Sequence, residues 1–297
     1  MKLWQKGAAA HQKVDHFTVG KDREYDLQLA AYDCEASMAH AQMLAKIGLL
    51  YPEEAAALVE GLYELKTAAQ EGSFTIEEEH EDMHSKIEHV LTERLGDLGK
   101  KIHTARSRND QVLVAMHLYL KEELKTIKTQ VVALFDLLLA LAEKHQAELI
   151  PGYTHLQVAM PSSMGLWLSA YAESLIDDLH FWQSAYTLAD QNPLGSAAGY
   201  GSAFPIDREF TTEVLGFEQI KVNAVAAQMS RGKLEKSTAM AFASIGSTLA
   251  KLSMDVCLYM GQDFNFISFP DELTTGSSIM PHKKNPDLFE LVRGKCN

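Results

Sequence analysis

The sequence TGSSIMPHKKNP, residues 275–286, combines a glycine, serine hydroxyls, two lysines and an asparagine just before a segment that has the pattern of the first turns of a helix. Gly276 permits a tight turn whose N–H groups can line a concavity, and Lys283 or Lys284 adds full positive charge. The composition therefore predicts a loop that binds a carboxylate or a phosphate. A polar surface loop ahead of a helix is the alternative.

A second polar loop, KKIHTARSRNDQ at residues 100–111, precedes a long run of apolar residues spaced three or four apart. That run predicts a helix of about 35 residues, or roughly 50 Å. Ser107, Asn109 or Asp110 could cap this helix. Arg106 and Arg108 would then lie at the positive end of the helix dipole, which is unfavourable unless an anion binds there. The loop is a second candidate anion site.

A third loop, PGYTHLQVAMP at residues 151–161, lies between two helical patterns, and we expect Pro161 in the first turn of the next helix. His155 is its chemically distinctive residue, because an imidazole can exchange a proton near neutral pH. A loop histidine is more often a surface or capping residue, and both interpretations stay open here.

The acidic run at residues 77–82 has the composition of a solvated surface or of a helix N-terminus. Within it, His80 and His84 have the His-Glu-x-x-His spacing that places two imidazoles on one helix face to bind zinc. A metallohydrolase is therefore a rival hypothesis. It is weak, because no third ligand stands at a recognisable spacing.

Composition limits the remaining possibilities. The 297 residues are 46% hydrophobic, enough for a large core, and the net charge of −13 disfavours nucleic-acid binding through bulk charge. Three cysteines at distant positions indicate reduced thiols in a cytoplasm. The sequence shows neither a secretory segment nor about 18 consecutive apolar residues, so no membrane association is expected.

The loops together resemble a known family. The pattern Gly-Ser-x-x-Met-x-x-Lys-x-Asn at residues 276–285 resembles the signature of the fumarase/aspartase superfamily. The fuller string at 277–287, with SRNDQ at 107–111, GYTHLQ at 152–157 and EDMH at 81–84, is most similar to the argininosuccinate lyase family. Ala105, Val158 and Met160 depart from that family's usual residues.

This resemblance implies an all-α fold, an elongated bundle of long helices with a smaller, mostly helical N-terminal domain. The expected domains are an N-terminal lyase domain at 1–105 and a central helical bundle at 106–297. The implied reaction is β-elimination of argininosuccinate, or a close N-substituted succinate, to fumarate and arginine, without a metal or an organic cofactor. A homotetramer whose sites combine three chains is also implied.

The resemblance assigns roles to individual residues. The family's catalytic positions fall on Ser277 as base, His155 as proton donor, Glu290 as its orienting carboxylate and Lys283 as an anion stabiliser. The substrate-binding positions fall on Asp82, His84, Ser107, Arg108, Asn109, Thr154, Gln157 and Asn285.

Two further family alternatives remain, another fumarate-releasing enzyme such as adenylosuccinate lyase, and a non-catalytic protein like the lens crystallins. The helical pattern that begins at Asp287 has barely started where the sequence stops. Because related lyases continue beyond this point, we expect a truncated chain, and negligible lyase activity from residues 1–297 alone.

Overall fold

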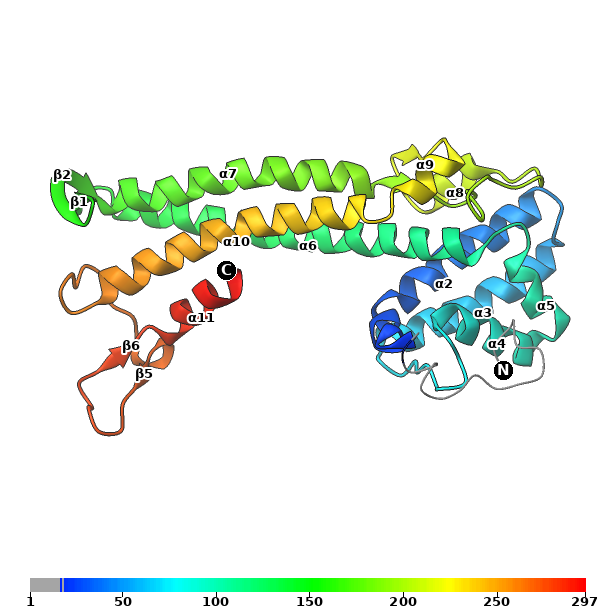
Figure 1. Cartoon of the computed structure of the whole chain (residues 1–297), viewed down its shortest axis with the longest axis horizontal. Coiled ribbons are helices and arrows are strands. Elements are labelled where there is room, and N and C mark those ends of the chain that lie inside the picture. Colours follow the sequence, from blue (N-terminus) through cyan, green and yellow to red (C-terminus); the bar gives the residue numbers. More distant parts are fainter. Residues whose placement is uncertain (1–16, 18) are drawn as a thin grey trace. The chain divides into compact units, whose positions relative to one another are not determined.

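The computed structural model describes residue 17 and residues 19–297, and its regular structure is mainly helical (Figure 1). The α-helices are α2 (Asp22–Lys46), α3 (Pro52–Gln70), α4 (Met83–Leu95), α5 (Asp97–Lys100), α6 (Arg108–Lys144), α7 (Met164–Ala189), α8 (Arg208–Val214), α9 (Ala224–Met229), α10 (Lys233–Met260) and α11 (Asp287–Cys296). Short 3₁₀ turns occupy Lys101–His103 and Asp271–Leu273. The strands are β1 (Leu149–Thr154), β2 (Gln157–Ser163), β3 (Gln191–Asn192), β4 (Gln219–Ile220), β5 (Thr275–Gly276) and β6 (Lys284–Asn285).

The chain divides into two compact units. Unit one comprises Met1–Glu122 and Thr187–Leu234, and unit two comprises Glu123–Tyr186 and Glu235–Asn297. The division expected from the sequence and the division found in the structure both keep residues 1–105 together. The structure also assigns residues 106–122 and 187–234 to unit one. The boundary expected from the sequence lies at the start of α6, whereas the packing assigns the first turns of α6 to unit one.

The core of unit one forms where α2, α3 and α4 pack together. Pro52 opens α3 in the position where its missing N–H is not needed, and the Tyr51 N–H bonds to Glu54 Oε2 at 3.0 Å. Apolar side chains from the three helices interlock, among them Leu44, Leu58, Leu62, Met83 and Leu91. A second cluster joins α2 and the first part of α6 to the 187–234 segment through Val114, Leu118, Leu194, Leu215 and Phe217.

Unit two is built on long helices. Its part of α6 lies beside α7 and α10 (Figure 1), and their facing side chains form one cluster that includes Val131, Leu138, Leu168, Leu175 and Ile245. Among the described helices, α10 alone is long and apolar enough for a membrane span by length and composition. Its apolar seam instead packs in this cluster, as expected for a core helix.

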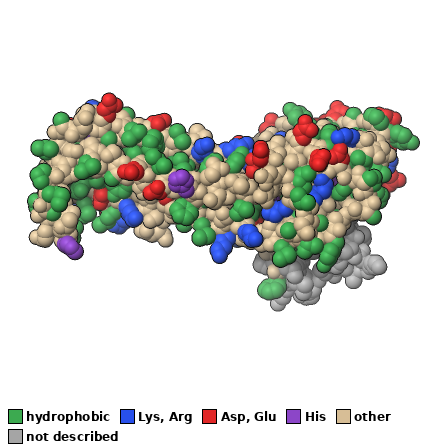
Figure 2. All heavy atoms as spheres, turned by 90° about the horizontal axis from the view of Figure 1, so that it is seen from above, with side chains coloured by type: hydrophobic (Ala, Val, Ile, Leu, Met, Phe, Trp, Pro, Cys, Tyr) green, Lys and Arg blue, Asp and Glu red, His purple; other side chains and the backbone are tan. Residues whose placement is uncertain are grey.

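Apolar side chains also remain on the surface of unit two, and Figure 2 shows hydrophobic groups in the solvent-facing layer. They come from all three long helices and include Leu137, Leu139, Leu166, Ile176, Phe181 and Met240. A surface of this kind is typical of a face that another chain or segment covers.

The predicted all-α fold class is confirmed, as are the long helix after residue 107 and the helix from Asp287. Residues 151–161 lie between two helices as expected, but the expected helix start at Pro161 is wrong. This segment belongs to an antiparallel hairpin of β1 and β2, and α7 begins at Met164 instead of near Pro161. Pro151 and Pro161 are paired across the hairpin, where the sequence suggested helix boundaries.

Two histidines in unit one are buried as neutral groups. His40 donates from Nε2 to the Thr104 carbonyl at 2.8 Å, and burial with the nearby Arg106 charge lowers its pKa to about 3. His117 bonds through Nδ1 to the Ala189 carbonyl at 2.9 Å, and burial lowers its pKa to about 4. The folded chain therefore binds fewer protons than the unfolded chain below the ordinary histidine pKa of about 6.5.

Stability should consequently fall as the pH falls. Between pH 7 and pH 5, each of His40 and His117 should lower the free energy of unfolding by about 2 kcal/mol. Urea denaturation of the chain and of the His40→Gln and His117→Gln variants at both pH values checks this. Each variant should lose part of this pH dependence. His84, whose pKa is raised, instead makes the folded state more stable as the pH falls, and it does so equally in all three proteins. An unchanged pH dependence in both variants would contradict the prediction.

Candidate active site

The acidic segment before α4 ends in a helix cap. Asp82 adopts an extended backbone and accepts hydrogen bonds from the Ser85 N–H and hydroxyl, both at 2.8 Å. Its second oxygen accepts a hydrogen bond from Arg108 Nη1 at 2.6 Å. The cap therefore joins the 77–82 segment to the first residue of α6, and two of the predicted substrate-binding residues lie in direct contact.

His84 is the second residue of α4 and is buried. Its Nδ1 is 3.0 Å from Oδ2 of Asp33, a fully buried carboxylate on α2. Burial alone would raise the pKa of Asp33, but the charges of His84, Arg106 and Arg108 hold it below its usual range. Burial lowers the pKa of His84, and Asp33 more than offsets this, so the net direction is upward. The pair is a buried ion pair.

The loop before α6 is fixed by Asp110. This fully buried carboxylate accepts the Ser107 N–H at 2.9 Å through Oδ1, and the Gly195 and Ala197 N–H groups at 3.0 and 2.9 Å through Oδ2. The Asn109 N–H reaches Ser107 Oγ at 3.3 Å. Ser107 and Asp110 thus share the capping that the sequence predicted. Asp110 also anchors the turn at Gly195–Ala197.

The same loop contains a strained residue. Ala105 has φ +61°, in the left-handed region that glycine occupies without penalty. This backbone geometry explains why the resembling family usually has glycine at the position of Ala105. The loop keeps the left-handed geometry even though the side chain disfavours it.

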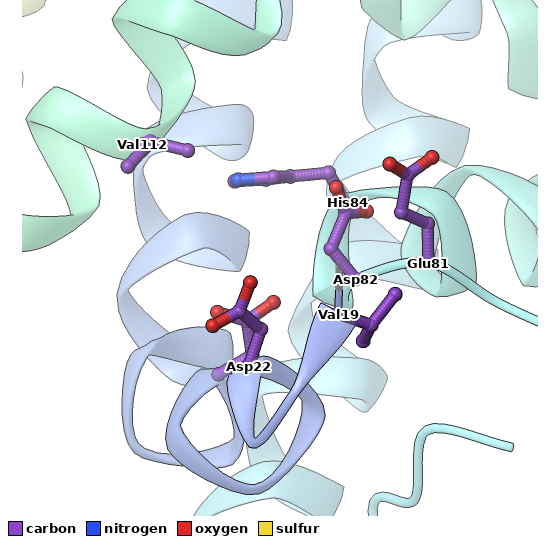
Figure 3. A pocket seen from close by; sticks show the side chains of 7 residues that line it. Val19, Asp22, Glu81, Asp82, His84 and Val112 are labelled. Atoms are coloured by element: carbon purple, nitrogen blue, oxygen red, sulfur yellow. The ribbon is translucent and has the colours of Figure 1, made fainter. Parts of the chain in front are cut away.

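A pocket of about 260 Å³ opens beside Asp82 and His84 in unit one (Figure 3). In Figure 3 the His84 ring reaches from α4 toward Val112. Carboxyl groups dominate the polar lining, and the lining residues are Val19, Asp22, Asp26, Glu81, Asp82, His84 and Val112. Such a pocket favours a ligand with a cationic group.

In unit two, His155 occupies the tip of the β1–β2 hairpin. His155 and Leu156 have φ +51° and +58°, so the two-residue loop has the geometry of a type I′ turn without the usual Asn-Gly sequence. Both side chains are exposed, as are Thr154 and Gln157. The backbone strain is located at the predicted proton donor.

An aromatic cluster holds the hairpin close to its tip. Tyr153 of β1 packs edge-on against Phe264, with ring centroids 5.5 Å apart, and it also contacts Phe266. Both phenylalanines contact Tyr259 near the end of α10, and Tyr259 contacts Trp167 of α7 at 5.0 Å. The exposed tip is therefore carried on a packed support.

The loop of residues 275–286 is closed at its base by the β5–β6 pair, in which Thr275 faces Asn285. The Thr275 hydroxyl donates to Asp287, and Asn285 Nδ2 donates to Thr275 Oγ1 at 3.3 Å. Ser277 is half-buried, whereas Lys283 is exposed. The structure thus forms the loop predicted for anion binding and keeps Ser277, Lys283 and Asn285 on it.

The expected pairing of Glu290 with His155 stays a prediction. Glu290 lies on α11, where its charge adds to burial in raising the pKa of Cys257 on α10. Both Glu290 and His155 are exposed. A pairing between copies of the chain remains a proposal.

The structural premise of the zinc hypothesis fails. Helix α4 begins at Met83, so His80 lies before it and cannot share a helix face with His84. His80 Nε2 is 3.7 Å from carboxylate oxygens of Glu77 and Glu79, and burial lowers its pKa. His84 is already paired with Asp33.

Several site residues were missed from the sequence. Asp22, Asp26 and Asp33 are spaced four and seven residues apart, which places them along one face of α2. Charged residues on a face that also carries Leu29 and Ala30 were an available signal of a buried polar site. Arg231, whose Nη2 donates to the Asn109 carbonyl at 2.9 Å, had no such signal.

Comparison with known proteins gives one consistent result. The model of a family described as "Lyase" matches residues 9–297. Argininosuccinate lyases of Parabacteroides distasonis and Phocaeicola vulgatus are 55% and 54% identical over 296 residues, covering 100% of this chain and 66% of each relative. A solved variant of an EDDS lyase with bound fumarate aligns with a TM-score of 0.82 and 27% identity, covering 98% of this chain and 57% of that chain.

Replacing Ala105 with glycine should stabilise the chain. Because glycine removes the left-handed penalty at φ +61°, Ala105→Gly should raise the free energy of unfolding by about 1 kcal/mol. Ala56→Gly, at an exposed position inside α3, is the matched control and should lower it by about 1 kcal/mol. Urea denaturation measures both, and losses of equal size would contradict the strain at Ala105.

Proposed function

Because the chain belongs to the lyase family whose model matches residues 9–297, we propose that it forms part of a lyase that splits argininosuccinate, or a close N-substituted succinate, into fumarate and arginine. The single observation that carries the proposal is the acidic pocket, whose lining residue Asp82 accepts a hydrogen bond from Arg108. It offers opposite charges to a substrate that carries a guanidinium and carboxylates. The named relatives support the same reaction, and the chain spans 66% of their length.

In unit one, the carboxylates of Asp22, Asp26 and Glu81 would receive the cationic part of the substrate. Arg108 and Asn109 at the start of α6 would receive a succinyl carboxylate, which would compete with Asp82 for the guanidinium of Arg108. Ser107 lies beside them at the helix N-terminus, where N–H groups favour an anion.

In unit two, Ser277 would remove the proton from the carbon beside a succinyl carboxylate. Charge then develops on that carboxylate, where Lys283, Asn285 and loop N–H groups would stabilise it. The neighbouring carbon–nitrogen bond breaks as the carbon–carbon double bond of fumarate forms. His155 would deliver a proton to the departing nitrogen, with Thr154 and Gln157 holding the substrate, and no metal or organic cofactor is needed.

We further propose a homotetramer whose copies complete each other's sites, and a cytoplasmic location. The exposed apolar side chains of α6, α7 and α10 support the assembly, because a buried helix interface would cover them (Figure 2). A Glu290 from another copy would then be available to orient His155. Nucleic acid and membrane are not expected partners.

The assignment is tested by measuring the turnover of argininosuccinate through the absorbance of the fumarate that forms. The chain is assayed alone and fused to the part of the Parabacteroides distasonis relative that it does not match. We expect negligible activity from the chain alone and turnover by the fusion, with no turnover of adenylosuccinate. A fusion that is folded but splits only adenylosuccinate, or neither compound, would contradict the proposal.

Two variants of the active fusion assign the proton transfers. Ser277→Ala should abolish elimination, and His155→Asn should lower turnover by at least about two orders of magnitude. Asparagine tolerates positive φ, so His155→Asn should not destabilise the turn. Leu156→Gly relieves strain at the neighbouring position and is the matched control, expected to keep turnover within a few-fold. Near-normal turnover by Ser277→Ala or His155→Asn would refute that residue's role.

A further inference from the structure

Asp33 lies behind His84 and belongs to none of the motifs that identify the site. It projects from α2, is fully buried, and places Oδ2 3.0 Å from Nδ1 of His84. His84 itself is only 4% exposed. A carboxylate in this position fixes the orientation of an imidazole and favours its protonated form.

The other ring nitrogen of His84 lacks a partner. Among the residues that the structure describes, neither buried ring nitrogen of His84 forms a hydrogen bond of regular geometry. Nδ1 has the ion-pair contact with Asp33, whereas Nε2 has no such contact, although His84 lines the acidic pocket (Figure 3). Buried polar atoms are nearly always hydrogen-bonded in native proteins. The unsatisfied nitrogen at the pocket therefore indicates a ligand atom that would complete it.

We propose that Asp33 is a positioning residue that holds His84 as an imidazolium with its Nε2–H directed into the pocket, where it selects ligands that carry a carboxylate beside a cationic group. The identity of the ligand rests on the proposed function. The role of Asp33 does not, because it follows from the geometry of the pair.

The charges around His84 favour the imidazolium. Asp33 faces it from α2, and Asp26 on the same helix and Asp82 at the N-terminus of α4 add negative charge. Arg108 at the start of α6 opposes them. Burial lowers the pKa of His84, but the carboxylates together raise it above its ordinary value.

The pocket then contains one donor cation among several carboxylates. The carboxylates attract an ammonium or guanidinium group, and the His84 Nε2–H offers a charge-assisted hydrogen bond to an anionic oxygen. Arginine carries both kinds of group. Agmatine is arginine without its carboxylate, so a comparison of the two compounds isolates the contribution of His84.

Titration of the histidine rings of the ¹⁵N-labelled chain by NMR tests the role of Asp33, with the His84 signals identified by their loss in His84→Gln. We expect His84 to titrate above the ordinary histidine pKa, and Asp33→Asn to lower its pKa by about one unit or more. Asp22→Asn removes another pocket carboxylate and should change the pKa of His84 less than Asp33→Asn does. A His84 pKa at or below the ordinary value in the unmodified chain would overturn the proposal, even if Asp33→Asn fails to fold.

Calorimetric binding of arginine and agmatine tests the ligand. Arginine should bind the unmodified chain about tenfold more tightly, the equivalent of one charge-assisted hydrogen bond. Asp33→Asn and His84→Gln should lose this preference while still binding agmatine. Equal affinities in the unmodified chain would overturn the selection by His84 but leave the acidic pocket in place. Binding of neither compound would overturn the ligand assigned to the pocket, and the titration alone would then decide the role of Asp33.

Discussion

The buried carboxylate of Asp110 is the constraint on which the unit-one site depends. It accepts three backbone N–H groups, one from Ser107 before α6 and two from the Gly195–Ala197 turn. Hydrogen bonds to an ionised carboxylate in a buried environment are strong, and losing the acceptor would leave buried donors unpaired. This one group therefore fixes the entry of α6 and, with it, Arg108 beside Asp82 and the pocket.

Unit two holds the hairpin tip with His155, the predicted proton donor, in a different way. The strained His155–Leu156 turn is exposed, so the packing of Tyr153 against Phe264 and Phe266 must hold it in place. The 275–286 loop is likewise closed at its base by the β5–β6 pair and the contact of Thr275 with Asp287. Both loops thus present a predicted catalytic residue on a packed or paired support, an arrangement that would suit preorganised catalysis.

The sequence predicted the features that depend on local periodicity. Apolar residues three and four apart indicated α6, and Asp287 marked a helix start that the structure confirms. The β1–β2 hairpin was missed because His-Leu carries no turn signal, and the paired strands hold the two residues in the left-handed region. Asp33 was missed because a single carboxylate on a helix becomes informative only when His84, 51 positions away, packs against it.

Analysis of the reaction products distinguishes the proposed elimination, which breaks a carbon–nitrogen bond, from other ways of splitting argininosuccinate. Argininosuccinate is incubated with the chain fused to the unmatched part of its relative, and the products are identified by proton NMR. The account predicts equal amounts of fumarate and arginine, with the fumarate vinyl signal appearing at the rate at which substrate disappears. Arginine released together with a saturated hydroxy acid instead of fumarate would show substitution by water, and would contradict the account.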